Sequence, residues 1–463
     1  MKNNKGMVEL TNKIAQFIWQ TKYENISPEV VEMGKFHILD TLGVLVAGSR
    51  EKATGIIKGY VQSMGCKEEC TLITQRIKTS PQYAAFGNGI IAHALDFDDY
   101  EWPSMAHPSV TVLPAVLALG EQIHAGGRLC LEAYLIGLEV ISKIGCGVNP
   151  SHYDKGWHST GTLGTLGAAA GAAKLLKCNP ETVKMALGIA SSMSSGLRGN
   201  FGTMTKAFHA GHASKSGIES VKLASLGFTA DKTILERELG FCSLFTEDKA
   251  YDIDKIVQNL GNPFSIVSPG VGIKPYPSCA ATHSVLDGVL SLIDQYAIQA
   301  EGVERVECGI FYLYPKILIH SEPRTGLEGK FSLEFCVAVA LLDNEVSLEK
   351  FTDEKVNQPE IQDLIKRVKQ FVTKEVGEWG IHYPGAIVKI DLKNGRSYQT
   401  KVEARKGSPL NPMSKDEVIH KFVANTSILF KRGRINEMIE KVMHVDDLKD
   451  IGEFIQYFDH EDS

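Results

Sequence analysis

The segment from Thr160 to Leu176 constrains the fold most, because it is built almost wholly from glycine, alanine, threonine and leucine. Small uncharged side chains let helix backbones approach closely, and a helix that is apolar all round is a buried one. We therefore predict a central helix packed on all sides by other helices. A membrane helix is the alternative interpretation, but His158 and Lys174 near its ends and the composition of the chain argue against it.

Length and overall charge narrow the class of protein. A chain of 463 residues is too long for one ordinary hydrophobic core, so two domains are expected. Its net charge of −6 provides no general basic surface, which argues against nucleic acid as a partner. A small anionic partner would instead need a local cluster of cations.

The N-terminal residues and the cysteines indicate a cytoplasmic protein. The start of the chain lacks the uninterrupted apolar core of a signal peptide, and the apolar run Ile38–Ala47 is far short of a membrane span. The nine cysteines are scattered and form no C-x-x-C pair, which is typical of free thiols in a reducing compartment. We predict a cytoplasmic location and no membrane segment.

Helical periodicity dominates residues 8–260, and the pattern changes after Pro263. Val303–Leu313 has the composition of a strand, and Gly385–Val402 alternates apolar and polar residues around an Asn-Gly dipeptide, which predicts a hairpin. Further helical segments are expected at 284–293, 332–342 and 359–368. This middle region therefore resembles a compact α+β unit.

Helices are expected again towards the C-terminus. Ser414 with Glu417 resembles a capping box that opens a helix, and helical sequence continues to about Phe458. These helices could return to the first domain. The expected fold is thus mainly α: a large helical domain at 1–264, completed by 406–463, and a smaller α+β lid domain at 265–405 inserted before the C-terminal helices.

Five stretches place histidine, lysine and aspartate inside sequence that is otherwise small and apolar. They lie at 92–108, 156–171, 196–212, 274–283 and 325–333. Cations and imidazoles seldom accompany helix-packing segments unless they converge on a polar pocket. We therefore expect a buried site for an anionic small molecule, which works by proton transfer and holds no metal.

The first stretch contains the densest acidic cluster, Asp96-Phe97-Asp98-Asp99. A magnesium site of the aspartate-rich kind would need a second acidic cluster, and a calcium loop would need a central glycine and a final glutamate. Neither pattern occurs. One interpretation is a solvated turn. In the other, a carboxylate, with Asp96 as the first candidate, orients a histidine or binds a substrate hydroxyl.

His107 and His158 each precede the start of an expected helix, in His-Pro-Ser and His-Ser-Thr. Unpaired N–H groups at a helix start attract anions and lower the pKa of an imidazole. Either histidine alone could be a capping or loop residue. Two of them at helix entrances indicate a shared pocket.

Lys206 follows the glycine-rich loop 196–203, which contains Arg198 and can direct N–H groups at a carboxylate or phosphate. The glycines match neither a P-loop nor a dinucleotide-binding motif. His209 and His212 share a helix face. A zinc site there would lack a third ligand, and Lys206 would repel the ion.

Lys274 opens the rigid segment Lys-Pro-Tyr-Pro-Ser-Cys and could project into a cleft between the domains, although a plain linker is the alternative. Cys279 and His283 lie four residues apart, a spacing compatible with thiol catalysis, but nothing nearby supplies an oxyanion site. Lys330, in the fifth stretch, is expected in a turn before the helix that begins near Ser332.

Six motifs, in order along the chain, resemble the MmgE/PrpD family, which includes 2-methylcitrate dehydratases, cis-aconitate decarboxylases and iminodisuccinate epimerases. They are HALDFDD at 93–99, HPS at 107–109, GWHSTGTLG at 156–164, MTKAFHAGHAS at 204–214, KPYPSC at 274–279 and KFSLEF at 330–335. The resemblance covers nearly the whole chain. It implies a helical N-terminal domain with a smaller α+β lid, a homodimer, and neither metal nor organic cofactor.

The resemblance also implies site residues. By similarity to the decarboxylase branch, the pocket would contain Asp96, His107, His158, Lys206 and Lys274. That branch has a pocket tyrosine, for which Tyr314 and Tyr312 are the candidates. It has a histidine where this chain has Cys279, and a threonine where this chain has Tyr100. Both departures put cis-aconitate decarboxylation in doubt.

We predict a hydro-lyase of the 2-methylcitrate dehydratase type that acts on a small di- or tricarboxylate. His158 would be the base and His107 the acid that protonates the leaving hydroxyl, or the reverse, with Asp96 orienting it. Lys206 and Lys274 would stabilise the enolate-like charge. Further substrate-binding candidates are His209, Arg198, Cys279 and Tyr314.

Three alternatives to the hydro-lyase remain open. The first is an epimerase of a dicarboxylate similar to iminodisuccinate, and the second is a cis-aconitate decarboxylase. The third, from a different class, is a non-catalytic protein that binds organic acids. The expected partners are a small anionic carboxylate and a second copy of the chain, without nucleic acid or membrane.

Overall fold

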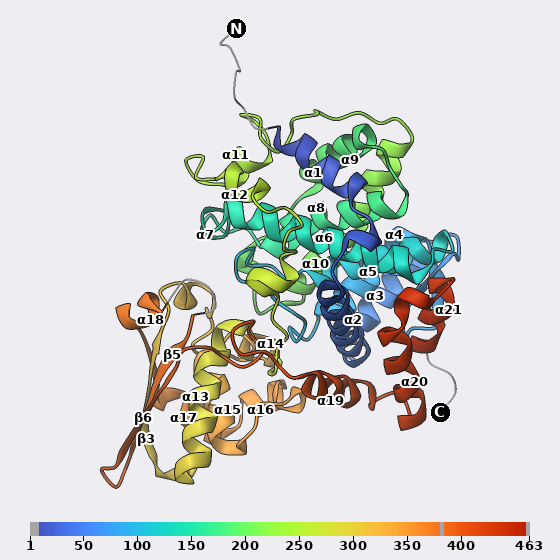
Figure 1. Cartoon of the computed structure of the whole chain (residues 1–463). Coiled ribbons are helices and arrows are strands. Elements are labelled where there is room, and N and C mark those ends of the chain that lie inside the picture. The colour runs from blue at the N-terminus through green and yellow to red at the C-terminus, as the bar shows by residue number, and fades with distance from the viewer. Residues whose placement is uncertain (1–8, 380–383, 460–463) are drawn as a thin grey trace.

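A computed structural model describes residues 9–379 and 384–459. It places a large helical body beside a smaller lobe of helices and one sheet (Figure 1), so the expected mainly α fold with an α+β lobe is confirmed. The longer helices of the body are α1 Leu10–Gln20, α2 Pro28–Gly48, α3 Lys52–Ser63, α4 Pro81–His93, α5 Ser109–Gln122, α6 Gly127–Val148, α8 Ser159–Leu175, α9 Pro180–Met193 and α10 Met204–Ser225. The short helices α7 Ser151–Asp154, α11 Phe241–Phe245 and α12 Ile253–Val257 complete it.

Helix α8 is the central helix that its composition predicts. Every residue of α8 except Lys174 is buried, and the helix packs against α5, α6, α9 and α10. Its glycines permit this contact: a Cβ on Gly167 would lie 2.3 Å from Ile141 Cγ1 and 2.8 Å from the carbonyl oxygen of Gly137. Over the two described ranges, none of the helices combines the length and apolarity that crossing a membrane requires.

Two parts of the body depart from the expected helices. Residues 226–260 contain only the five-residue helices α11 and α12, and the other part is a hairpin. The strand β1, Cys70–Leu72, pairs antiparallel with β2, Ile77–Thr79, and forms a small hairpin between α3 and α4. Strands of three residues are too short to show the alternation by which a strand is recognised in a sequence. The expectation that 8–260 is almost wholly helical is wrong at this hairpin and over 226–260.

The smaller lobe contains a four-stranded sheet in the order β4-β3-β5-β6. Its strands are β3 Val303–Ile310, β4 Val368–Val372, β5 Ala386–Leu392 and β6 Ser397–Val402. Strand β3 runs parallel to β4 and antiparallel to β5, and the hairpin expected around the Asn-Gly dipeptide is confirmed, with Gly395 at a φ of 82°. Strand β4 was not expected, because it begins directly where α17 ends.

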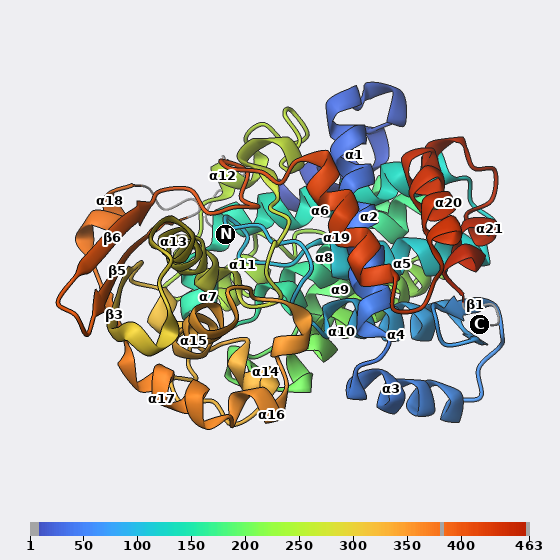
Figure 2. The ribbon, with the colours of Figure 1, turned by 90° about the horizontal axis from the view of Figure 1, so that it is seen from below.

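Helices cover one face of this sheet. Helices α13 Ala280–Tyr296, α15 Leu333–Asp343 and α17 Pro359–Arg367 match the three segments predicted as helical. The short helices α14 Gly326–Gly329, α16 Asp353–Val356 and α18 Lys374–Glu378 belong to the same lobe. In Figure 2 the sheet forms the outer side of the lobe, and α13 and α15 lie between it and the body.

The C-terminal helices α19 Lys415–Thr426, α20 Arg432–Met443 and α21 Ile451–Ile455 return to the body, where α19 and α20 pack on α2 and α21 packs on α5. The capping box of Ser414 and Glu417 at the start of α19 is confirmed. One hydrophobic core joins these helices to residues 10–273, and a second core occupies 281–390 together with a few aromatic residues of the body. The smaller lobe, called the lid below, therefore has its own core.

Candidate active site

The acidic run 96–99 lies buried between α4 and α5. Its three aspartates are at most 3% exposed, so the interpretation as a solvated turn is wrong. Each acidic group has a partner from another element: Asp99 contacts His37 Nδ1 at 2.9 Å, for example. Lys421 of α19 donates a hydrogen bond of 2.7 Å to the carbonyl oxygen of Phe97. The run is thus fixed by the helices around it.

Asp96 lies where two lysines from different lobes meet. Lys206 of α10 donates to Asp96 Oδ1 at 2.9 Å, and Lys274 of the lid donates to the same oxygen at 2.7 Å. Lys274 also donates to the carbonyl oxygen of Asp96 at 2.8 Å. The φ of Asp96 is 51°, in the left-handed region that aspartate tolerates better than most residues. The structure brings together three residues that the sequence predicted separately.

Electrostatics keep this cluster ionised. Burial would raise the pKa of Asp96, but Lys206 and Lys274 outweigh burial and hold that pKa well below its usual range. Burial would favour the neutral amine of Lys274, yet Asp96 outweighs it and raises the lysine's pKa. An ammonium group has three N–H donors, and two of those of Lys274 go to Asp96.

His93, the last residue of α4, joins the cluster although it was not predicted as a site residue. Its Nδ1 lies 3.0 Å from both carboxylate oxygens of Asp98, and its Nε2 lies 2.8 Å from Lys206 Nζ. Burial is the main cause that lowers its pKa to about 3, although Asp98 opposes it. The ring is therefore neutral, donates from Nδ1 to Asp98 and accepts from Lys206 at Nε2. The HALDFDD motif, which begins with His93, was the signal that could have identified it.

His107 precedes α5 and faces the same carboxylates. Its Nδ1 lies 2.8 Å from the carbonyl oxygen of Asp99 and 3.1 Å from Asp98 Oδ2, so this nitrogen carries a proton and donates it. Its Nε2 lies 3.7 Å from Asp96 Oδ1. The nitrogen that can exchange a proton with a ligand is therefore Nε2.

His158 caps the N-terminus of α8 and is 1% exposed. Its Nδ1 lies 2.9 Å from His209 Nδ1 of α10, and its ring stacks on His93 at a centroid distance of 6.0 Å. Burial lowers the pKa of His158 well below its ordinary value, and the neighbouring cationic groups add to this; burial and Lys206 also lower the pKa of His209 to about 4. The ring of His158 is therefore neutral, but a pKa this far lowered opposes the uptake of a proton.

A cavity of about 530 Å³ lies between the lobes and opens onto this cluster. His93, Asp96 and Lys206 line it from the body, and Lys330 and Phe331 line it from the lid. Lys330, expected in a turn, is indeed at the end of the short helix α14, but it is buried and reaches the cavity. Both lobes therefore form the cavity, but only three of the five stretches line it: 92–108, 196–212 and 325–333. His107, His158 and Lys274 contact the cluster from behind the lining residues.

Two predicted substrate-binding residues lie in other contacts. The Tyr314 hydroxyl accepts a hydrogen bond from Arg405 and donates to the carbonyl oxygen of Pro384. The Arg198 guanidinium donates to two carbonyl oxygens, one of Tyr153 in the body and one in the lid. Arg198 therefore links the lobes. A substrate contact by either residue stays a prediction.

Cys279 and His283 do not form a catalytic thiol pair. His283 Nε2 lies 3.1 Å from the carbonyl oxygen of Ser278, and its ring meets the edge of Tyr276. Cys279 sits at the N-terminal cap of α13, where burial raises the pKa of its thiol. A raised pKa opposes thiolate formation. Substrate binding by Cys279 stays a prediction.

The cluster also contains metal-ligand atoms. One donor atom from each of His93, Asp96, Asp98 and His107 lies within 4.8 Å of the others. Two ammonium groups already share one oxygen of Asp96, however, and like charges about 4 Å apart repel by about 4 kcal/mol at an effective dielectric constant of about 20. The donors are better suited to sharing protons than to holding a divalent cation. Activity in the presence of a chelator tests the prediction that the site holds no metal.

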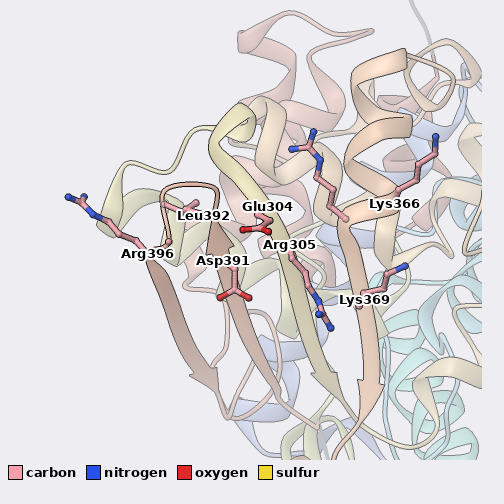
Figure 3. A pocket seen from close by; sticks show the side chains of 9 residues that line it. Glu304, Arg305, Lys366, Lys369, Asp391, Leu392 and Arg396 are labelled. Carbon is pink, nitrogen blue, oxygen red and sulfur yellow. The ribbon is translucent and has the colours of Figure 1, made fainter.

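A second hollow of about 720 Å³ lies on the sheet of the lid (Figure 3). It is lined by Glu304, Arg305, Lys366, Arg367, Lys369, Asp391, Leu392, Gly395 and Arg396. The labelled side chains point in different directions, and Arg396 at the hairpin points away from the others (Figure 3). Because no common centre forms, this hollow is a weaker candidate than the cavity between the lobes.

Fold and site together define a two-lobed protein in which an α+β lid covers buried acid–base groups of a helical body. The model of the MmgE/PrpD N-terminal domain matches residues 12–254, and that of the MmgE/PrpD C-terminal domain matches residues 276–445. The chain belongs to the MmgE/PrpD family, as its motifs indicate. The second match includes α19 and α20 besides the lid.

Characterised relatives extend over both lobes. The cis-aconitate decarboxylase of Homo sapiens is 27% identical over 456 residues, which cover 95% of this chain and 92% of that protein. The cis-aconitate decarboxylase of Aspergillus terreus is 26% identical over 479 residues, which cover 96% of this chain and 95% of that protein. A third, from Mus musculus, is 27% identical over 456 residues, covering 95% of this chain and 91% of that protein.

Proposed function

We propose that this protein is a lyase that acts on a small di- or tricarboxylate, and that the reaction is the dehydration of a hydroxy acid similar to 2-methylcitrate. The observation that carries the proposal is the meeting of Lys206 and Lys274, from different lobes, on one oxygen of Asp96. Such a pair of ammonium groups binds a carboxylate and stabilises the charge that develops beside it.

The chemistry needs a base, an acid and a site for negative charge. A proton leaves the carbon next to a carboxylate, and an enolate-like anion forms beside Lys206 and Lys274. His158 is the proposed base because its neutral ring has a lone pair, and a bound anion would counter the neighbouring groups that lower its pKa. His107 exposes Nε2 towards Asp96, which supports its role as the acid that protonates the leaving hydroxyl and releases water. Such groups contribute about 10²–10⁴-fold each.

Decarboxylation of cis-aconitate is the second candidate. The observation that favours it is the similarity of the whole chain to cis-aconitate decarboxylases at up to 27% identity. It requires the same stabilised anion, but carbon dioxide leaves and the carbon then takes up a proton. Against it, the resemblance implies a histidine in the decarboxylase branch at the position where this chain has Cys279.

One experiment separates these reactions. The purified protein is incubated with 2-methylcitrate, citrate, cis-aconitate and an aminodicarboxylate, and the products are analysed by mass spectrometry. Loss of water identifies a hydro-lyase, and loss of carbon dioxide identifies a decarboxylase. Deuterium uptake from heavy water with neither loss identifies an epimerase. Conversion of none of these acids would contradict the proposal.

Variants then test the site. Lys206→Ala should lower turnover about 100- to 1,000-fold, the usual effect of removing one group that stabilises developing charge. Lys215→Ala, on the same helix but away from the cluster, serves as the control and should retain activity. Turnover of Lys206→Ala equal to that of the control would contradict the mechanism. Activity should persist in a chelator, and its loss there would overturn the metal-free mechanism.

Two further predictions remain for solution experiments. We propose that the protein works as a homodimer and that it is located in the cytoplasm. Analytical ultracentrifugation tests the first, and localisation of a tagged protein tests the second.

A further inference from the structure

Lys330 is a lid lysine for which the reaction described above has no role. It lies at the C-terminal end of α14, is 4% exposed and lines the same cavity as Asp96 and Lys206. A lysine is almost never buried to this extent unless it is paired or functional. Its surroundings therefore need an explanation.

The position of Lys330 is fixed relative to the lid segment that carries Lys274. Its Nζ donates a hydrogen bond of 2.8 Å to the carbonyl oxygen of Pro277 and lies 4.4 Å from the centre of the Phe351 ring. Its own carbonyl oxygen accepts from the backbone N–H of Cys279 at 2.9 Å. The two lid lysines are thus held in one rigid arrangement.

Among the described residues, no carboxylate lies within ion-pair distance of Lys330. Lys206 and Lys274, by contrast, share Asp96. The carboxylates of Glu328 and Asp353, which also line the cavity, accept hydrogen bonds from backbone N–H groups. Lys330 is held by a carbonyl oxygen and an aromatic ring, and Asp96 and Glu51 act on it from beyond ion-pair distance. An anion bound in the cavity would pair with it directly and offset the cost of its burial.

We propose that Lys330 binds a carboxylate of the substrate that is remote from the reacting carbon, and that it thereby selects acids with more than one carboxylate. This inference rests on the proposed function, which places another carboxylate at Lys206 and Lys274. The lid would then supply two groups: Lys274, which stabilises the charge at the reacting carbon, and Lys330, which binds the remote carboxylate. A monocarboxylate would leave Lys330 unmatched.

The pH dependence of binding follows from the groups that face Lys330. They are Asp96 from the acidic run, Glu51 at the start of α3, Lys274 from the lid and Cys336 from α15. Burial lowers the pKa of Lys330 to about 8, while Asp96 and Glu51 oppose this effect. The ammonium form is therefore present at pH 7 and is lost as the pH rises through about 8. Affinity for a polycarboxylate should weaken over the same range.

Calorimetric binding of tricarballylate, a saturated tricarboxylate that cannot be dehydrated, tests the inference. Lys330→Met removes the charge but keeps the length of the side chain, and Lys52→Met removes an exposed lysine that lines the same cavity. At pH 7 we expect Lys330→Met to weaken binding about 10- to 100-fold, as expected for a lost hydrogen bond to a charged group. Lys52→Met should weaken it less than about fivefold.

Two further readouts distinguish binding from a structural role. The melting temperature of Lys330→Met should be unchanged or raised, because an apolar side chain replaces a buried charge. The weakening of tricarballylate binding above about pH 8 should disappear in this variant. Equal dissociation constants for Lys330→Met and the wild type would overturn the role of Lys330 but leave the lyase proposal intact. Failure of the wild type to bind tricarballylate would overturn both.

Discussion

Asp96 is the residue on which the charged groups of the candidate site converge. One of its oxygens accepts from Lys206 and Lys274, and the same oxygen lies 3.7 Å from His107 Nε2. The two ammonium groups are at most 5% exposed, so neither has water as a ready substitute partner. Because the lysines come from different lobes, Asp96 also joins the lid to the body.

Removal of this charge should therefore destabilise the whole protein. Asp96→Asn leaves two buried ammonium groups uncompensated, and we expect the free energy of unfolding at pH 7 to fall by about 3–5 kcal/mol. Urea unfolding followed by circular dichroism measures it. The control is Asp254→Asn, an exposed residue in the first turn of α12, which should cost less than about 1 kcal/mol. Equal losses in the two variants would show that Asp96 does not hold the cluster together.

The residues that meet on Asp96 were predictable because each is a charged group in a stretch that is otherwise small and apolar. His93 was not, because it is one histidine at the end of an apolar helix and its partner Lys206 is 113 positions further along the chain. For Lys330, the sequence predicted the turn before the helix near Ser332 but not its position in the cavity. A contact between distant segments leaves no periodic pattern in the sequence, so only the fold reveals it.

At the scale of elements, the helices were easier to predict than the strands. The composition of α8 predicts a central helix, and the Asn-Gly dipeptide predicts the hairpin of β5 and β6. Strand β4 was missed because Val368, its first residue, directly follows α17 and was assigned to the helix expected at 359–368. Its pairing with β3 supplies the hydrogen bonds that select a strand, and such a tertiary effect is outside local propensity.

The close packing of α8 can be tested with a pair of glycines. Gly167→Ala should lower the free energy of unfolding by about 1–3 kcal/mol, because its Cβ would overlap Ile141. Gly55→Ala, in the exposed helix α3 with open space around it, should instead raise it by about 0.5–1 kcal/mol. Thermal unfolding of both variants provides the comparison. Stabilisation by both substitutions would contradict close packing around α8.

On the scale of the whole molecule, the structure buries several neutral histidines. Burial is the main cause that lowers the pKa of His93 to about 3 and those of His152 and His209 to about 4. An unfolded chain binds a proton at each histidine below about pH 6.5. The unfolded state therefore binds more protons than the folded state between about pH 6.5 and 4, and the free energy of unfolding falls as the pH drops through this range.

His152 allows this linkage to be measured away from the candidate site. It contacts Thr162 and the carbonyl oxygen of Phe245, and glutamine offers similar hydrogen bonds without a titrating ring. Because the pKa of His152 is about 4 in the folded state, this histidine should lower the free energy of unfolding by about 2 kcal/mol between pH 7.5 and pH 5. Urea unfolding at the two pH values should show that the free energy of unfolding of His152→Gln drops by about 2 kcal/mol less than that of the wild type. An equal drop in His152→Gln and the wild type would contradict the burial argument.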